Sequence, residues 1–322
     1  MHTLGTDVVL DLFVSLVFMQ ALGFYLLYPI VILVSKSPFW LLYRISDAFY
    51  LLVYYVIRYR KSVVLNNLKN SFPERSDKEI KSICKGFYRY LCDLIVESVK
   101  TITWNEEHVR SRVKMQNVEM LDHLHEQGKS IVIVMGHLGN WEWAGPCFSL
   151  SCKHQLFVVY RPLTNAYFEK VFSGSRTKFT TKIIPKSNTL RSMIANKKTI
   201  SATALIADQA PSPITSAMWI EFLHQDTAVF VGPEKVAKML DYPVVYMQVE
   251  RVKRGYYEVH PTLLTEHPKE TSDTEITVAF NKILEEGIQK YPETWLWSHK
   301  RWKHKRSTES IASNEIERPV KN

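Results

Sequence analysis

Short apolar runs alternate with amphipathic segments over the central part of the chain, and this alternation predicts its fold. Residues 131–135 read Ile-Val-Ile-Val-Met, an apolar, β-branched run typical of a parallel strand buried on both faces. Further strands are expected at 155–160, 182–184, 199–206, 244–250 and 256–259. One helix is expected before the first strand, at 118–126, and helical spacing alternates with the strands at 166–178, 189–195, 233–240 and 274–290. The pattern therefore predicts an α/β domain with a mostly parallel sheet flanked by helices.

The longest apolar stretch lies near the N-terminus, from Val8 to Val34. Its length suffices to cross a hydrocarbon core of ~30 Å. It has neither the basic start nor the small-residue cleavage site of a secretory signal. We therefore expect a retained membrane anchor helix; the alternative is a helix buried in the protein core.

A second apolar segment, residues 38–59, is dense in aromatic side chains. Arg44 and Asp47 make it a poor spanning helix, so we expect it at the membrane interface or packed on the domain. Basic residues follow at 58, 60 and 61, which by the positive-inside rule places the main domain on the cytoplasmic side.

These features divide the chain into three parts. Residues 1–60 form the expected anchor and interfacial helix, and residues 61–303 form the α/β domain, in which Ser76 and Glu79 make a capping box. Residues 304–322 are polar and lack periodicity, which predicts a disordered tail.

The chain of 322 residues carries a formal net charge of +9. This charge favours anionic partners: nucleic acid, acidic lipid headgroups or phosphorylated substrates. The four cysteines have no metal-ligand spacing and are expected to be reduced, mostly buried thiols.

The candidate chemistry begins where the first predicted strand ends. His137 follows that strand, and Glu142 stands five residues on, in the first turn of a predicted helix. Functional residues collect beyond the carboxyl ends of parallel strands. A carboxylate on one imidazole nitrogen would fix the tautomer and raise the basicity of the other nitrogen. The alternative is an ordinary surface pair. Because the chain has no Gly-x-Ser-x-Gly elbow, we expect direct transfer between two bound substrates, without a covalent enzyme intermediate.

Other candidate site residues follow later strands. Arg161 and Arg176 could bind phosphate or an oxyanion, or be solvated surface charges. Asp208 could belong to the site or cap a helix. The Trp-rich segment 295–303 has three interpretations: a membrane contact, a cation–π cluster under the fold, or a nucleic-acid patch.

Several motifs together resemble one family. They are Tyr59-Arg60, Asn67-Leu68, Phe72-Pro73, Gly136-His137 to Glu142, Tyr160-Arg161-Pro162 with Asn165, Ile184-Pro185, Ala207-Asp208-Gln209, Phe230 to Pro233 and Pro292 to Trp302. In order and spacing the chain is similar to the late lauroyl/myristoyl acyltransferases of lipid A biosynthesis, within the lysophospholipid acyltransferase superfamily, and a glycerolipid-acyltransferase-like fold is implied.

The resemblance implies roles for these residues. His137 is the general base and Glu142 orients it, while Arg176, Asp208 and Arg161 bind substrate or stabilise the oxyanion. The donor is acyl carrier protein, or acyl-CoA, and the acceptor is a hydroxyl of a lipid A precursor on the cytoplasmic face of the bacterial inner membrane. No metal, redox cofactor or nucleic acid is implied.

Two competing functions remain. The first is the same chemistry on a lysophospholipid, an aminolipid or a glycolipid. The second is a non-catalytic, membrane-attached binding protein, supported only by the basic charge and the Trp-rich segment.

Overall fold

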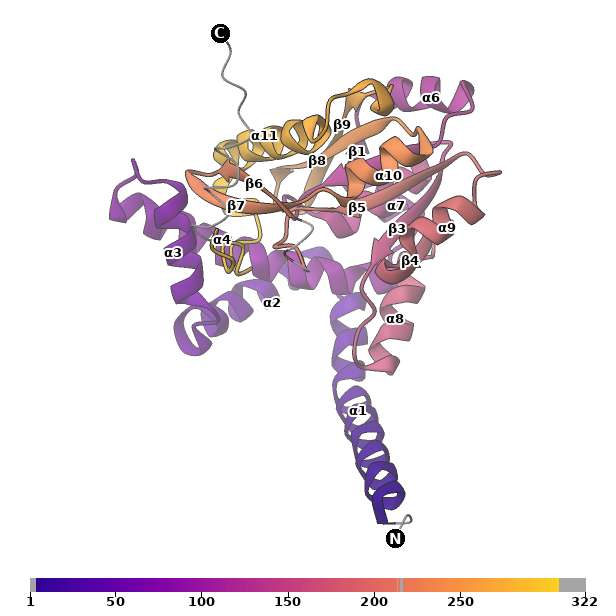
Figure 1. The fold of residues 1–322 in the computed structure, drawn as a ribbon. Helices are drawn as coiled ribbons and strands as arrows, with labels where there is room; N and C mark the ends of the chain where they lie inside the picture. Colours follow the sequence, from indigo (N-terminus) through magenta and orange to yellow (C-terminus); the bar gives the residue numbers. More distant parts are fainter. Residues whose placement is uncertain (1–3, 213, 215–216, 307–322) are drawn as a thin grey trace.

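A seven-stranded sheet forms the centre of the molecule, in the order β1-β9-β8-β2-β5-β3-β4 (Figure 1). The computed structural model describes residues 4–212, 214 and 217–306. Every neighbouring pair is parallel except β8 and β9, so the sheet is mostly parallel, as predicted. The strands are β1 Val113–Met115, β2 Ile131–Met135, β3 Gln155–Tyr160, β4 Lys182–Pro185, β5 Ser201–Ile206, β8 Val244–Lys253 and β9 Tyr256–Thr265.

The six predicted strands are all present, with shifts at their ends. Three further strands were not predicted. One is β1, which has only three residues and is too short to show a period. The others are β6 (Ala217–Phe222) and β7 (Gln225–Phe230), which pair as a separate antiparallel hairpin.

Helices cover both faces of the sheet, and the five predicted at 118–126, 166–178, 189–195, 233–240 and 274–290 are present. The helices are α1 Leu4–Lys36, α2 Phe39–Leu51, α3 Lys61–Ser71, α4 Asp77–Lys100, α5 Glu106–Arg112, α6 Val118–Glu126, α7 Trp141–Ser151, α8 Ala166–Arg176, α9 Thr189–Ala195, α10 Gly232–Leu240 and α11 Glu275–Lys290. A π-helical segment, η1 (Leu52–Ile57), continues α2, and short 3₁₀ turns lie at Thr101–Thr103, Lys186–Asn188, Pro268–Glu270 and Pro292–Thr294. The expected capping box opens α4: Glu79 N–H donates to Ser76 Oγ, and Ser76 N–H donates to the Glu79 carboxylate.

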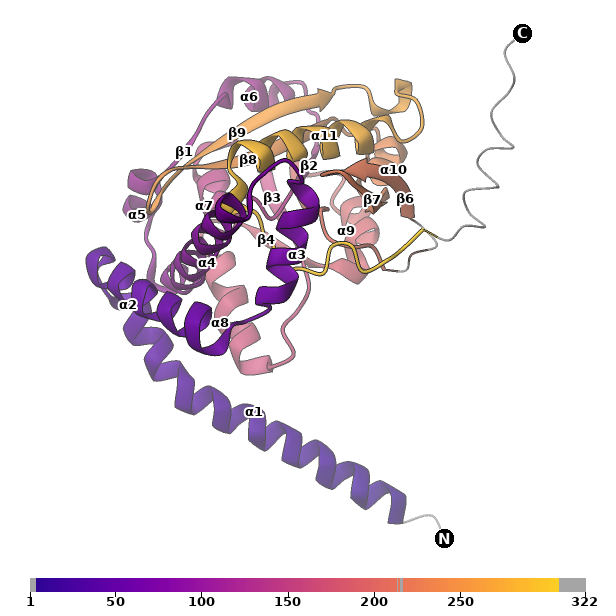
Figure 2. The same cartoon turned by 90° about the vertical axis from the view of Figure 1, so that its left-hand side faces the viewer.

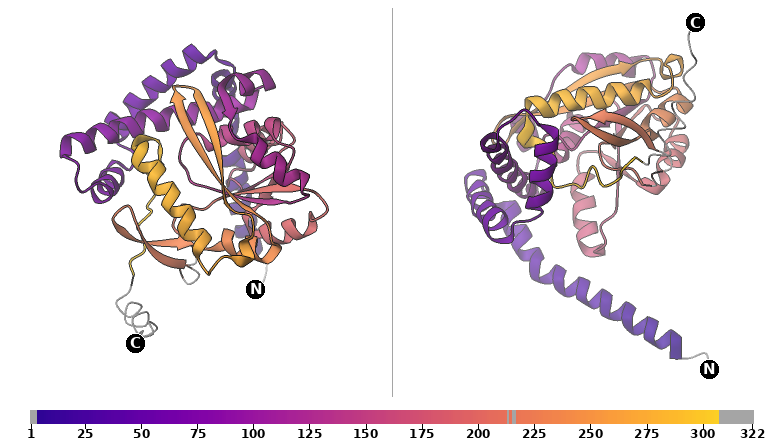
Figure 3. Two further views of the ribbon diagram at one scale, coloured as in Figure 1. Left: turned by 90° about the horizontal axis from the view of Figure 1, so that it is seen from above. Right: turned by 60° about the vertical axis from the view of Figure 1, so that its left-hand side comes forward.

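Two apolar clusters pack against opposite faces of the sheet. Helix α11 runs along one of these faces (Figure 3). Alternate residues of β2 belong to different clusters, because successive side chains of a strand point to opposite faces. Val132 and Val134 join the cluster that includes α10 and α11, whereas Ile133 and Met135 join the one that includes α7. The centre of the sheet is therefore covered on both faces, and the chain leaves the carboxyl end of β2 through the loop that carries His137.

Helix α1 projects from the domain as a long rod (Figures 1 and 2), and its C-terminal part packs against other helices. The ring of Phe24 lies 5.3 Å from that of Tyr167 and 5.0 Å from that of Phe168, both on α8. The Lys100 ammonium binds the carbonyls of Ser35 and Ser37, each at 2.8 Å. Large apolar side chains between residues 22 and 33 are exposed, unlike those of a core helix.

Part of the expected anchor at 8–34 lies outside the residues whose side chains are described. Among the residues with described side chains, Phe39–Ile57 is the one helical segment long and apolar enough to cross a membrane by length and composition. Gln20–Lys36 is a shorter apolar helix. Both segments expose apolar side chains, so the division between an anchor at 8–34 and an interfacial helix at 38–59 remains a proposal. The predicted tail falls mainly on residues 307–322, outside the described residues.

The cysteines are all free, as expected. Cys84, Cys92 and Cys147 are buried, and Cys152 is partly exposed. Burial raises the pKa of the Cys84 thiol to about 11 and those of the other three to about 12.

Candidate active site

The loop from residue 136 to residue 140 joins β2 to α7 and can take its shape only with glycine at two positions. A Cβ on Gly136 would lie 2.5 Å from a methyl group of Leu284. Gly139 has φ +69°, and a Cβ there would lie 2.0 Å from the carbonyl oxygen of Val249. Gly139 N–H donates to the Thr294 carbonyl at 3.1 Å. Close packing and backbone bonding thus fix the position of His137 between the two glycines.

Asp208 is the carboxylate that binds His137. Its Oδ1 lies 2.6 Å from His137 Nδ1, and its Oδ2 accepts the backbone N–H of His137 at 2.7 Å. The two residues meet because β2 and β5 are parallel neighbours in a register that pairs Met135 with Ile206. His137 lies two residues after Met135, and Asp208 lies two residues after Ile206.

Trp295 completes the surroundings of this carboxylate. Its indole N–H donates to Asp208 Oδ2 at 2.8 Å. Burial would raise the pKa of Asp208, but the charge of His137 and the hydrogen bonds from His137 and Trp295 outweigh it and lower the pKa to about 2. Asp208 is therefore an anion, and an anion only accepts hydrogen bonds. The proton of neutral His137 consequently sits on Nδ1, which leaves the lone pair on Nε2.

Glu142 does not make the contact with His137 that we expected. It instead forms a two-point ion pair with Arg176, in which Nε donates to Oε2 at 3.1 Å and Nη2 donates to Oε1 at 2.7 Å. Its position in the first turn of α7 directs it to α8, while the ring of Trp141 lies 4.8 Å from that of His137 at 80°. The hydrogen-bonding partner of the imidazole was thus wrongly predicted.

The Glu142–Arg176 pair fixes the guanidinium in place. Burial lowers the pKa of Arg176, but the hydrogen bond and the charge of Glu142 have the opposite effect, and the net pKa is raised. A planar guanidinium has more N–H donors than the two used here, so others remain for a substrate oxygen.

A cavity of about 830 Å³ brings the predicted residues together. His137, Glu142, Arg161 and Arg176 all line it, and Asp208 lies behind His137. Arg161 is exposed. The volume is within the range of ~300–1,000 Å³ usual for ligand pockets. The apolar residues that line it include Met115, Ile133, Met135, Ala144, Phe148, Leu156, Val158, Ala204, Ile206 and Met247.

The Trp-rich segment is part of the core. Trp295 and Trp297 are buried, and their rings meet edge to face at 4.7 Å. The Arg301 guanidinium lies 6.0 Å from the ring of Phe222. Of the three interpretations, these contacts fit the cluster under the fold, and they exclude a membrane or nucleic-acid contact for the two buried indoles.

Two residues near His137 were not singled out from the sequence for the contacts they make. They are Trp295, the donor to Asp208, and Gln209, whose Nε2 lies 3.4 Å from His137 Nε2. Both belong to motifs that the sequence analysis noted, but their contacts depend on the spatial order of the strands. Within the described part of the chain, no cluster of three His, Cys, Asp or Glu residues has the arrangement of a metal site.

Comparison with known proteins identifies the class to which this fold and site belong. The family described as bacterial lipid A biosynthesis acyltransferase matches residues 14–304. The chain therefore belongs to this family and is an acyltransferase.

Three curated relatives define the similarity more closely. A lipid A biosynthesis palmitoleoyltransferase of Escherichia coli (strain K12) is 24% identical over 249 residues, which cover 77% of this chain and 80% of the relative. A lipid A biosynthesis acyltransferase of Shigella flexneri matches to the same extent. A lipid A biosynthesis lauroyltransferase of Escherichia coli (strain K12) is 22% identical over 272 residues, covering 84% of this chain and 88% of the relative.

Proposed function

We propose that the protein transfers a fatty acyl chain from the thioester of acyl carrier protein to a hydroxyl of a lipid A precursor. The observation that carries the proposal is the His137–Asp208 pair, whose histidine lines a cavity with many apolar residues in its wall. The apolar part of a cavity of this size accommodates an acyl chain, and the His–Asp pair supplies a base next to which the thioester would lie.

The reaction follows from the positions of three groups. Nε2 of His137 takes the proton of the acceptor hydroxyl as its oxygen attacks the thioester carbonyl carbon. Arg176, held by Glu142, stabilises the negative charge that develops on the carbonyl oxygen. When the carbon–sulfur bond breaks, the proton on Nε2 passes to the leaving thiolate.

Asp208 and Glu142 orient these groups without touching the reacting atoms. Asp208 keeps His137 in the tautomer that a base needs, and Glu142 keeps Arg176 at the cavity. Arg161, exposed at the same cavity, is available for an anionic group of the donor or the acceptor.

The proposed membrane position is supported by the N-terminal helices. We place the protein at the bacterial inner membrane, with α1 inserted, α2 and η1 at the interface and the α/β domain on the cytoplasmic side. The support is the exposure of Tyr25 and Leu33 on α1, and of Trp40 and Val56 on the following helix. The net charge of +9 suits anionic lipids and an acidic carrier protein.

The test is transfer of a radiolabelled acyl chain from acyl carrier protein by the purified protein in detergent. A lipid A precursor and a lysophospholipid are offered as acceptors. His137→Ala should reduce transfer by about 10²–10⁴-fold, because it removes the base. The matched control is His123→Ala, a histidine exposed on α6. Near-normal transfer by His137→Ala would refute the mechanism, and acylation of the lysophospholipid alone would refute the acceptor.

A further inference from the structure

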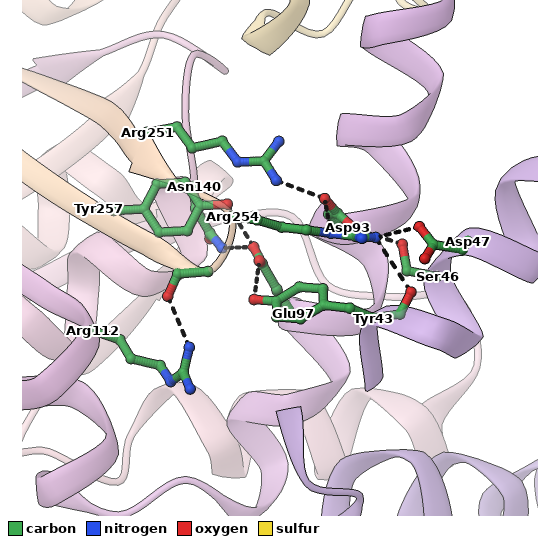
Figure 4. A network of polar contacts seen from close by, with 11 residues as sticks. Tyr43, Ser46, Asp47, Asp93, Glu97, Arg112, Asn140, Arg251, Arg254 and Tyr257 are labelled. Carbon is green, nitrogen blue, oxygen red and sulfur yellow. Dashed lines mark hydrogen bonds and ion pairs between the residues drawn. The ribbon is translucent and has the colours of Figure 1, made fainter. Parts of the chain in front are cut away.

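A buried acid outside the cavity binds the loop that carries His137 (Figure 4). Glu97 lies on α4 with 0% of its surface exposed. Its Oε2 accepts Asn140 Nδ2 and the Tyr257 hydroxyl, each at 2.7 Å, and its Oε1 accepts the Tyr43 hydroxyl at 2.8 Å. A buried carboxylate is costly unless hydrogen bonds satisfy it, and here it has three donors from three different parts of the chain.

The first contact reaches the start of α7. Asn140 is fully buried and is the N-cap residue of that helix: its Oδ1 accepts the backbone N–H of Trp143 at 3.0 Å, while its Nδ2 donates to Glu97. The Trp143 indole N–H donates to the backbone carbonyl of Glu97 at 3.0 Å. Glu97 thus holds the first turn of α7 at two points.

That first turn carries two side chains of the candidate active site. Trp141 lies against the ring of His137, and Glu142 binds Arg176. A shift or rotation of the first turn moves both contacts together. The effect reaches the base and the oxyanion donor, although Glu97 touches neither.

The third contact leads to the N-terminal helices. Tyr43 lies on α2, and on the same helix Ser46 donates to Asp93 Oδ1 at 2.7 Å. Arg254 joins the two helices again through Asp47 and Asp93 (Figure 4). Since α2 begins the apolar segment Phe39–Ile57, this polar network connects the segment suited to a membrane with the active-site loop.

We propose that Glu97 is a positioning residue that sets the first turn of α7 by joining Asn140 to Tyr43 of α2. The expected change in kcat rests on the proposed acyl transfer. The expected change in the position of the first turn of α7 can be measured without any activity.

A swap of amide and carboxylate tests the contact directly. In Asn140→Asp the new carboxylate still caps α7, but it loses the donor and faces Glu97, so kcat should fall by about 10- to 100-fold with KM for the acyl donor within about twofold. Adding Glu97→Gln restores a donor–acceptor pair, in which residue 97 now donates and residue 140 accepts. The new amide nitrogen donates to the carboxylate introduced at position 140 and to the Tyr257 hydroxyl oxygen, and the amide oxygen accepts from Tyr43. The double variant should therefore recover kcat to within about threefold of wild type.

The contact between Glu97 and α2 is tested by a second variant with its own control. Tyr43→Phe removes the hydroxyl that binds Glu97, and should lower kcat by about threefold. Tyr90→Phe is the control: Tyr90 lies on α4, as Glu97 does, and its buried hydroxyl has no hydrogen-bond partner among the residues that the structure describes. It should leave kcat unchanged.

Hydrogen–deuterium exchange of the amides at 138–146 gives the readout that does not depend on activity. Asn140→Asp should speed exchange there, and the double variant should restore protection. If the swap restores protection while neither wild type nor any variant transfers acyl chains, the contact stands and the proposed function fails. If His137→Ala abolishes transfer but the swap restores neither protection nor kcat, the inference about Glu97 is overturned and the proposed function stands. A double variant that regains thermal stability without regaining kcat also overturns it, because the contact would then be structural alone.

Discussion

Replacing Asp208 by Asn isolates the charge that orients His137. Asp208 Oδ2 accepts two N–H groups, from the His137 backbone and the Trp295 indole, while Oδ1 accepts the imidazole proton. An asparagine that keeps the first two bonds must turn its NH₂ group toward Nδ1. The imidazole proton then moves to Nε2, where it blocks the lone pair that should act as base.

The substitution should lower both the stability of the protein and its rate of acyl transfer. The folded protein lowers the pKa of Asp208 from 3.8 to about 2, which corresponds to about 2.5 kcal/mol of stabilisation of the anion. Because the pKa is lower in the folded state, this stability is present above pH ~4 and is lost as the pH falls toward ~2. At neutral pH the variant should therefore lose about 2 kcal/mol of stability, and its transfer rate should fall by about 10²–10⁴-fold.

The assay compares Asp208→Asn, His137→Ala and the double variant at one temperature below all three melting points. Since Asp208 acts through His137, the double variant should be no slower than His137→Ala alone. Losses that multiply in the double variant would refute this reasoning, as would a folded Asp208→Asn protein that retains more than about a tenth of the wild-type rate.

Three further predictions concern single residues. Trp295→Phe keeps the ring packing but removes one donor to the carboxylate behind the base, so the acyl-transfer rate should fall by about tenfold; an unchanged rate would mean that this bond has no part in the reaction. Ala204→Met adds volume to the cavity wall, so the variant should prefer shorter acyl chains when donors of different length compete. An unchanged preference would contradict this prediction. Burial raises the pKa of Glu97 to about 7 against hydrogen bonds from Tyr257 and Tyr43, so stability should be full below pH ~4.5 and fall by about 3 kcal/mol as the pH rises through ~7. Unfolding curves between pH 5 and 9 measure that fall, and Glu97→Gln should remove it; a wild-type curve as flat as that of the variant would contradict it.

The sheet could be predicted because its strands are short, apolar and separated by helical patterns. Residues 131–135 gave a clear signal, since both faces of β2 are buried. The β6–β7 hairpin did not, because its residues alternate less regularly and several remain partly exposed. A three-residue strand such as β1 has no period to recognise.

The site was predicted in composition but not in its pairing. Nearness in sequence favoured Glu142 as the partner of His137, whereas the register of β2 and β5 brings Asp208 there. That register depends on which strands are neighbours, and no local pattern specifies it. The role of Glu97 could not be predicted for a similar reason. A glutamate on an amphipathic helix usually indicates the solvent face, and this one is buried only because α2, α4 and α7 meet around it.

The state of the cysteines makes the chain a favourable starting point for thiol chemistry. Maleimides react with thiolates, and the raised pKa values of the four native thiols, together with burial, keep that form scarce at neutral pH. A single cysteine introduced at Trp40 or Leu33, both exposed, would therefore react against a low background without removal of the native cysteines. Spin labels or fluorophores placed one at a time along α1 and α2 could then report how deep each turn lies in a bilayer, in a protein whose interior is otherwise unaltered.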